Sequence, residues 1–191
     1  MVEKSLQTES IDLPKPVVMV GLMGAGKSRI GRELAAKLNL SFVDADDEII
    51  KAAGCSISDI FEMYGEAAFR DVEIRVISRL LKGKAQIIAT GGGAFINAAV
   101  RKAIADQGIS LWLRADLDIL VERTSRRDGR PLLAKGDPRV ILKGLMDERY
   151  PVYAEADIVV ESKNVPIDDT VNEAATALSA FIANRAETRK Q

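Results

Sequence analysis

Short apolar runs alternate along the chain with longer segments that carry apolar residues on one side only. The runs Val17–Val20, Gln86–Ala89 and Ile109–Leu113 have the length of strands and are largely apolar, as strands buried on both faces are. From Lys27 to about Asn39, apolar residues instead recur at helical spacing. Strands that alternate with helices in this way form parallel βαβ units. The pattern therefore predicts an α/β domain whose sheet is covered on both faces.

The rest of the chain continues this alternation. Further strands are expected at Ser41–Asp44 and Asp157–Val160, and Asp46 and Asp116 are expected to cap the helices that follow them. The remaining helices are expected from Ser56 or Ser58, from about Glu66 to Leu81 after a break at Gly65, over Ala98–Gln107, from Asp116 to roughly Arg126, from Pro138 to Tyr150, and over Val165–Asn184.

The segment Gly21–Ser28 has the spacing of a phosphate-binding loop between a strand and a helix. Its glycines let backbone N–H groups approach a phosphate closely, and the N-terminus of the following helix favours the same anion. Lys27 can reach the β- and γ-phosphates, and Ser28 can hold Mg²⁺. A glycine-rich turn without function is the alternative, but the flanking strand and helix favour a nucleotide site. The expected contacts to a nucleoside triphosphate are Gly24, Ala25, Gly26, Lys27, Ser28 and Arg29.

Length and composition indicate one domain. The chain has 191 residues, of which 47% are hydrophobic, which suits a single buried core. We expect residues 1–191 to form one domain, with residues 1–16 as a flexible lead-in and residues 185–191 as a flexible tail.

Charge and the rarer residue types exclude several functions. The net charge of −1 gives no basic footprint for nucleic acid, and no apolar run is long enough to span a membrane. Cys55 is the single cysteine, and no secretory leader is evident, so we expect a cytoplasmic protein. Histidine is absent, so proton transfer must fall to Asp, Glu, Lys or water.

Six segments, in this order and spacing, resemble the shikimate kinase family. They are Gly21–Ser28, Asp44-Ala-Asp46, Phe69-Arg70 with Glu73, Gly91–Gly93, Arg130-Pro-Leu-Leu, and Arg149-Tyr-Pro-Val-Tyr153. The resemblance runs from about Val17 to Tyr153.

The resemblance implies a P-loop kinase fold like that of nucleoside monophosphate kinases, with a five-stranded parallel sheet flanked by helices. It also implies a substrate-binding helical region at residues 44–75 and a lid at residues 126–137. The implied reaction moves the γ-phosphoryl group of ATP to the 3-hydroxyl of shikimate. The products are shikimate 3-phosphate and ADP, within chorismate and aromatic amino acid biosynthesis. The implied protein is a monomer with Mg²⁺ as cofactor.

Two aspartates after the second strand have different expected roles. Asp44 could hold Mg²⁺ with Ser28, directly or through water. Asp46 could accept hydrogen bonds from neighbouring hydroxyls of a polyol and receive the proton of the attacking one, and family members bind the substrate hydroxyls with the matching residue. The alternative for both is helix capping.

The resemblance assigns the substrate carboxylate to a clamp of Arg70 and Arg149, whose planar guanidinium groups can pair with it bidentately. Glu73 is expected to orient Arg70 from the same helical face. Gly92 and Gly93 would offer backbone N–H groups and a close approach to the substrate. A solvated arginine and a plain tight turn are the alternatives.

Two further arginines complete the expected site. Arg130 matches the family arginine that contacts both the substrate and the transferred phosphate, and Arg123 matches a residue that packs on adenine, although a helix end alone would also explain it. Asp128 and Gly129 precede Arg130 where the family often has a small apolar residue. The catalytic residues are thus expected to be Lys27, Asp46 and Arg130.

Two other functions stay open from sequence. A gluconate kinase shares a phosphate loop of this kind, but Arg70 and Arg149 suit a cyclic carboxylate better. A catalytically silent nucleotide-binding module would be expected to lose Lys27 or the acidic pair, and this chain retains them.

Overall fold

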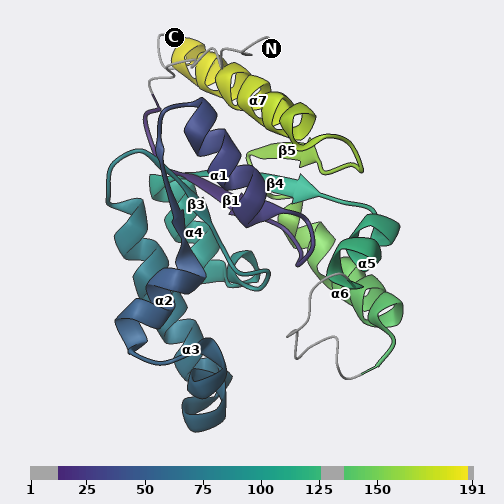
Figure 1. Ribbon diagram of the computed structural model, residues 1–191. Helices are drawn as coiled ribbons and strands as arrows, with labels where there is room; N and C mark the ends of the chain where they lie inside the picture. Colours follow the sequence, from purple (N-terminus) through teal and green to yellow (C-terminus); the bar gives the residue numbers. More distant parts are fainter. Residues whose placement is uncertain (1–12, 126–135, 189–191) are drawn as a thin grey trace, which may run out of the picture.

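A computed structural model describes residues 13–125 and 136–188 of the chain (Figure 1). Its centre is a sheet of five parallel strands in the order β2-β3-β1-β4-β5. The strands are β1 (Val17–Val20), β2 (Ser41–Asp44), β3 (Gln86–Ala89), β4 (Ile109–Arg114) and β5 (Ile158–Glu161). The α/β class and the five-stranded parallel sheet predicted from sequence are confirmed.

Helices connect the strands and cover the sheet. They are α1 (Lys27–Lys37), α2 (Ala45–Ala53), α3 (Ile57–Leu81), the short η1 (Ala94–Ile96), α4 (Ala98–Gln107), α5 (Leu117–Ser125), α6 (Pro138–Tyr153) and α7 (Ile167–Thr188). Helix α1 packs against β3 and α7, and α4 packs against β4 and α3. At Gly31 of α1, a Cβ would lie 3.1 Å from the Phe42 ring and 3.4 Å from Ile87, so the helix sits directly on the sheet. In the described part of the chain, no helix is long and apolar enough to cross a membrane.

Both ends of the folded part are longer than the sequence analysis expected. Leu13 is buried, and the carbonyl of Pro16 accepts a hydrogen bond from the N–H of Ile109 at 2.9 Å. The end of the expected lead-in is therefore anchored to the sheet. Helix α7 runs to Thr188 instead of Asn184, and the Arg185 guanidinium lies 5.0 Å from the Phe181 ring. That contact between consecutive turns favours helix in part of the expected tail.

Two helix boundaries also differ from expectation. Asp44, and not Asp46, caps α2, because its Oδ1 accepts a hydrogen bond from the N–H of Asp46 at 3.1 Å. Helix α6 continues through Pro151 to Tyr153, although proline removes a helical hydrogen bond. The buried Tyr153 ring packs 5.8 Å from the Trp112 ring, and this tertiary contact outweighs the local preference.

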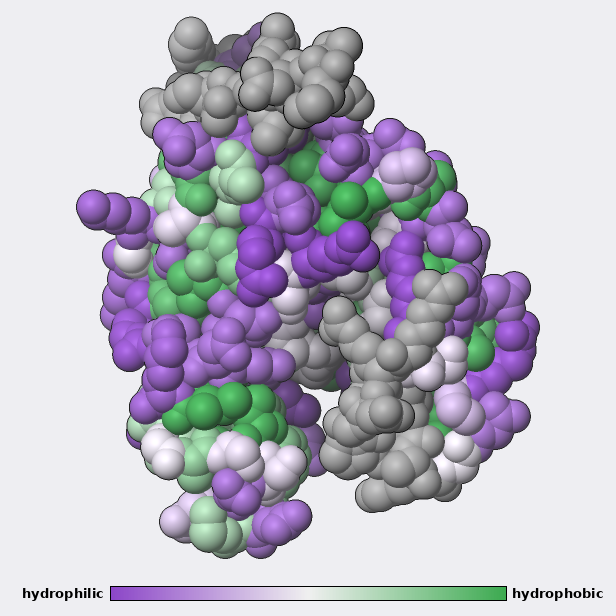
Figure 2. Space-filling model, in the orientation of Figure 1, coloured by the Kyte–Doolittle hydropathy of each residue, from purple (hydrophilic) through white to green (hydrophobic). Residues whose placement is uncertain are grey.

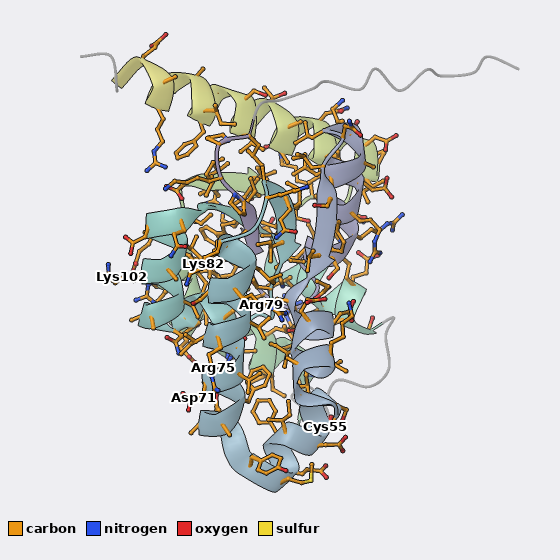
Figure 3. All side chains as sticks on the ribbon, turned by 90° about the vertical axis from the view of Figure 1, so that its left-hand side faces the viewer. Cys55, Asp71, Arg75, Arg79, Lys82 and Lys102 are labelled. Atoms are coloured by element: carbon orange, nitrogen blue, oxygen red, sulfur yellow. The ribbon has the colours of Figure 1, made fainter. Side chains whose placement is uncertain are left out.

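The segment expected to bind substrate forms a lobe of two helices, α2 and α3, below the sheet (Figure 1). Ser56 begins α3 with a capping box, and Gly65 kinks the helix with φ 80° and ψ 174°. Arg75 and Arg79 are exposed on α3, and Lys82 directly follows the end of the helix (Figure 3). Arg79 pairs with Glu48 of α2 at 2.8 Å, so the two helices of the lobe are tied together at their surface.

The expected lid at residues 126–137 falls mostly outside the described residues, and Arg130 with it. Its last residue has a structural role: Asp137 caps α6 by accepting a hydrogen bond from the N–H of Arg139 at 2.8 Å.

Candidate active site

A cleft of about 1080 Å³ opens beyond the carboxyl ends of β1, β2 and β3. Figure 2 shows the surface hollowed beside the lobe of α2 and α3. This edge is where parallel α/β sheets bind ligands, because loops from several strands meet there. Residues predicted from sequence that line the cleft include Gly24, Lys27, Asp44, Asp46, Gly92 and Arg123.

The loop between β1 and α1 has a backbone that requires glycine. Gly21 has φ 134°, and a Cβ there would lie 2.7 Å from the Leu113 carbonyl oxygen. Gly26 has φ 97° and directly precedes α1 as its N-cap, and the N-terminus of this helix faces the cleft. The Lys27 ammonium donates hydrogen bonds to the carbonyl oxygens of Gly21 at 2.8 Å and Leu22 at 3.0 Å. The loop is thus preformed, with its lysine beside the backbone that would hold a phosphate.

Ser28 and Asp44 come from neighbouring elements and meet in the cleft. The Ser28 hydroxyl donates a hydrogen bond to Asp44 Oδ2 at 2.7 Å. A hydroxyl and a carboxylate oxygen fit Mg²⁺, which prefers oxygen ligands and keeps several waters or phosphate oxygens of its own. Among the described residues, no group of three or more His, Cys, Asp and Glu side chains could hold a metal.

Asp46 lies in the cleft between the phosphate loop and the turn after β3. Its Oδ1 is 3.2 Å from where a Cβ of Gly91 would stand. Burial, followed by the neighbouring charge of Asp44, raises the pKa of Asp46 from 3.8 to about 6, while Lys27 lowers it. The carboxylate is thus mostly ionised at neutral pH but holds its proton more tightly than an ordinary aspartate. That combination suits a group that accepts a proton from a hydroxyl.

Arg70 reaches the same turn from α3. Its guanidinium pairs with Glu73 at 2.7 Å and with Glu66 at 3.1 Å, and a Cβ on Gly93 would lie 2.7 Å from its Nη2. Glu73 is 1% exposed, and burial raises the pKa of its carboxyl even though Arg70 lowers it. The expected orienting role of Glu73 agrees with this contact. Arg70 itself is only partly buried, and in this structure its Nε and Nη2 both donate to the exposed Glu66 carboxylate, at 3.3 Å and 3.1 Å.

Arg149 reaches the turn from α6, on the far side of Gly92. Its Nη1 donates a hydrogen bond to the Gly92 carbonyl oxygen at 3.3 Å. Its Nε is buried and makes no hydrogen bond within the described structure, and the nearest carboxylate oxygen, on Glu148, is 3.9 Å away. A buried donor without an acceptor is costly, so it indicates a place where an anionic ligand would bind. Arg70 and Arg149 thus meet at Gly92 and Gly93.

The opposite end of the cleft is formed by Arg123 and the loop after β5. Arg123 donates hydrogen bonds to Ser162 Oγ at 2.8 Å and to the Lys163 carbonyl oxygen at 2.6 Å. Asn164, Val165 and Pro166 line the cleft with it, and none of these three was predicted. The sequence could have indicated these residues, because the loop follows the carboxyl end of a predicted parallel strand, where ligands bind in such sheets. Arg29 lines the cleft as expected, while Ala25 is buried and its N–H donates to the Leu22 carbonyl within the loop.

Comparisons with known proteins agree with this geometry. A family model described as shikimate kinase matches residues 23–179. A shikimate kinase of Paramagnetospirillum magneticum is 54% identical over 168 residues, which are 88% of this chain and 86% of that protein. One of Brucella canis is 51% identical over 179 residues, which are 92% and 90% of the two chains. A solved structure of shikimate kinase from Acinetobacter baumannii in complex with shikimate has a TM-score of 0.81 and 36% identity, and the match covers 89% of this chain and 94% of that one.

Proposed function

Since the chain belongs to the shikimate kinase family, we propose that the cleft between the phosphate loop and the turn at Gly92 and Gly93 is its active site. The protein is an ATP-dependent kinase that transfers the γ-phosphoryl group of ATP to the 3-hydroxyl of shikimate. The observation that carries the site assignment is that Arg70 and Arg149 both contact one glycine turn, at Gly93 and Gly92, and that Gly92 lines the same cleft as Lys27.

The nucleotide would occupy the end of the cleft between α1 and α7. The backbone of Gly24, Gly26 and Ser28 would cradle its phosphates at the N-terminus of α1, with Arg29 beside them. The base would lie between the Arg123 guanidinium, which can stack on an aromatic face, and the loop of residues 164–166. Lys27 would exchange its bonds with the loop carbonyls for bonds to the β- and γ-phosphates.

Ser28 and Asp44 are the residues that would hold Mg²⁺. The ion, when bound with ATP, would neutralise charge on the phosphates. The hydrogen bond between Ser28 and Asp44 already brings the two oxygens to one point of the cleft.

Shikimate would lie at the other end, with its carboxylate on Arg70 and Arg149 and its hydroxyls toward Asp46. Asp46 would hold the 3-hydroxyl in line and take its proton as the oxygen bonds to the γ-phosphorus and the bond to the ADP oxygen breaks. Lys27 would stabilise the charge that develops on the transferred group. Arg130, which lies outside the described residues, is proposed for the same role on the strength of the family pattern.

Substitution of the two clamp arginines tests this assignment. Arg70→Ala and Arg149→Ala are expected to raise the KM for shikimate by about 10- to 100-fold, as loss of a charge-assisted contact predicts, with little change in the KM for ATP. Arg75→Ala is the matched control on the outer side of α3 (Figure 3). Equal KM values for shikimate in all three variants would show that Arg70 and Arg149 do not bind the substrate carboxylate.

The alternative functions receive less support. The two relatives described above, at 54% and 51% identity, are both shikimate kinases, which disfavours a gluconate kinase. A silent module is disfavoured because Lys27, Asp44 and Asp46 line one cleft. We further propose a cytoplasmic monomer with no nucleic-acid or membrane partner, on the grounds of its charge and the family pattern.

A further inference from the structure

The carbonyl oxygen of Gly92 is held by two side chains of α6. Arg149 Nη1 donates to it at 3.3 Å, and the Tyr153 hydroxyl also donates to it. The two residues are four apart and so lie on the same face of the helix. Gly92 lines the cleft, and a Cβ on it would lie 3.9 Å from Arg149 Nη1. One backbone carbonyl thus connects α6 to the wall of the active site.

The Tyr153 ring packs among three other aromatic rings. Its side chain is fully buried, with the rings of Trp112 at 5.8 Å, Tyr150 at 6.2 Å and Phe95 at 6.4 Å. Burial raises the pKa of Tyr153 to about 12, despite a lowering influence from Arg149, so the hydroxyl keeps its proton at neutral pH. Because the ring cannot easily turn and the hydroxyl stays protonated, Tyr153 remains a hydrogen-bond donor to the Gly92 carbonyl.

We propose that Tyr153 is a positioning residue for substrate binding, because its hydroxyl shares the Gly92 carbonyl with Arg149 and so keeps the guanidinium from closing fully onto that carbonyl, where it could no longer pair with the substrate carboxylate. The inference rests on the proposed function of Arg149. At 3.3 Å the hydrogen bond from Arg149 to the Gly92 carbonyl is long, and the Tyr153 hydroxyl is the second donor to that oxygen. Without the hydroxyl, the carbonyl would depend on Arg149 alone, and the guanidinium would be drawn toward it and away from the ligand.

Removal of the hydroxyl alone tests the proposal. Tyr153→Phe keeps the packed ring and is expected to raise the KM and the dissociation constant for shikimate about three- to tenfold, with kcat and the KM for ATP changed less than about twofold. Tyr150→Phe is the matched control: its hydroxyl donates to the Ala115 carbonyl, and its ring packs edge-on against Trp112. This control is expected to leave the KM for shikimate within about twofold of wild type. The dissociation constants are measured by calorimetry at low temperature, where both variants stay folded even if they lose some stability.

A double-mutant cycle separates positioning from general destabilisation. In an Arg149→Ala background, Tyr153→Phe is expected to cause no further loss of shikimate affinity, since the group it positions is gone. An equal loss in both backgrounds, or the same loss in Tyr150→Phe, would overturn the positioning role. The proposed function fails separately, if Arg149→Ala by itself leaves shikimate affinity unchanged.

Discussion

The guanidinium of Arg70 occupies the space where a side chain on Gly93 would begin. A Cβ on Gly93 would lie 2.7 Å from Nη2 and 2.9 Å from Nη1 of Arg70. The backbone of Gly93, at φ −94° and ψ −15°, is one that any residue adopts. The glycine is therefore required by the arginine beside it and not by the turn.

Gly93→Ala is accordingly expected to fold and to displace Arg70, because the far end of a long side chain moves easily. The KM for shikimate should rise by about 10- to 100-fold, while the KM for ATP stays close to wild type. Gly144→Ala is the control, since Gly144 is in α6 and a Cβ there would meet nothing within 4 Å. A wild-type KM in Gly93→Ala would show that Arg70 does not need this space.

The ionised Asp46 carboxylate is expected to lower the free energy of unfolding, although the same charge is needed for activity. The folded state holds its proton more tightly, with a pKa of about 6 against 3.8, so ionisation destabilises the fold. That cost is fully present above about pH 6 and disappears toward pH 3.8. Asp46→Asn should therefore increase the free energy of unfolding by about 1–3 kcal/mol at pH 8, with a smaller gain at pH 4, while abolishing most turnover.

Urea unfolding at the two pH values measures this effect, and Asp47→Asn serves as the exposed neighbour for comparison. A gain of the same size at both pH values would assign the effect to packing and not to the buried charge.

The rate of phosphoryl transfer should also depend on the ionisation of Asp46. We expect kcat/KM for shikimate to fall as the pH drops through about 6, because protonated Asp46 cannot accept the hydroxyl proton. Carboxyl NMR of the protein without ligands should give Asp46 a pKa near 6. Lys27→Met should move that pKa higher, since Lys27 lowers it. A pKa near 4 in both proteins would contradict the environment described for Asp46.

Gly65 is needed for a different reason than Gly93. Its φ of 80° and ψ of 174° lie in a region open almost only to glycine, yet a Cβ would meet nothing within 4 Å. Gly65→Ala is therefore expected to lower the free energy of unfolding by about 1–3 kcal/mol through backbone strain alone. Chemical denaturation measures the loss. A change below about 0.5 kcal/mol would mean that the kink relaxes without cost.

Local patterns were enough to predict much of the molecule. The strand Val17–Val20 and the loop that ends at Ser28 could be identified because strand length, glycine spacing and helix periodicity are short-range properties. The placement of Asp44 and Asp46 at a strand end followed from the same reasoning. The roles of Arg70 and Arg149 came only from the family pattern, because an arginine on a helix is ordinarily a solvated residue.

What could not be predicted depends on contacts between distant parts of the chain. Helix α6 passes Pro151 because Tyr153 is buried against Trp112, a residue of β4. The loop of residues 164–166 joins the cleft only once β5 takes its place at the edge of the sheet. The two donors on the Gly92 carbonyl likewise come from residues about 60 positions away.

The most direct test of the account is the release of ADP from Mg²⁺ and ATP with shikimate, gluconate or no acceptor, with Lys27→Ala to detect contaminating activity. The account predicts rapid ADP release with shikimate alone, formation of the 3-phosphate ester, and loss of nearly all turnover in Lys27→Ala. Release with gluconate but not shikimate, or undiminished turnover in Lys27→Ala, would contradict it.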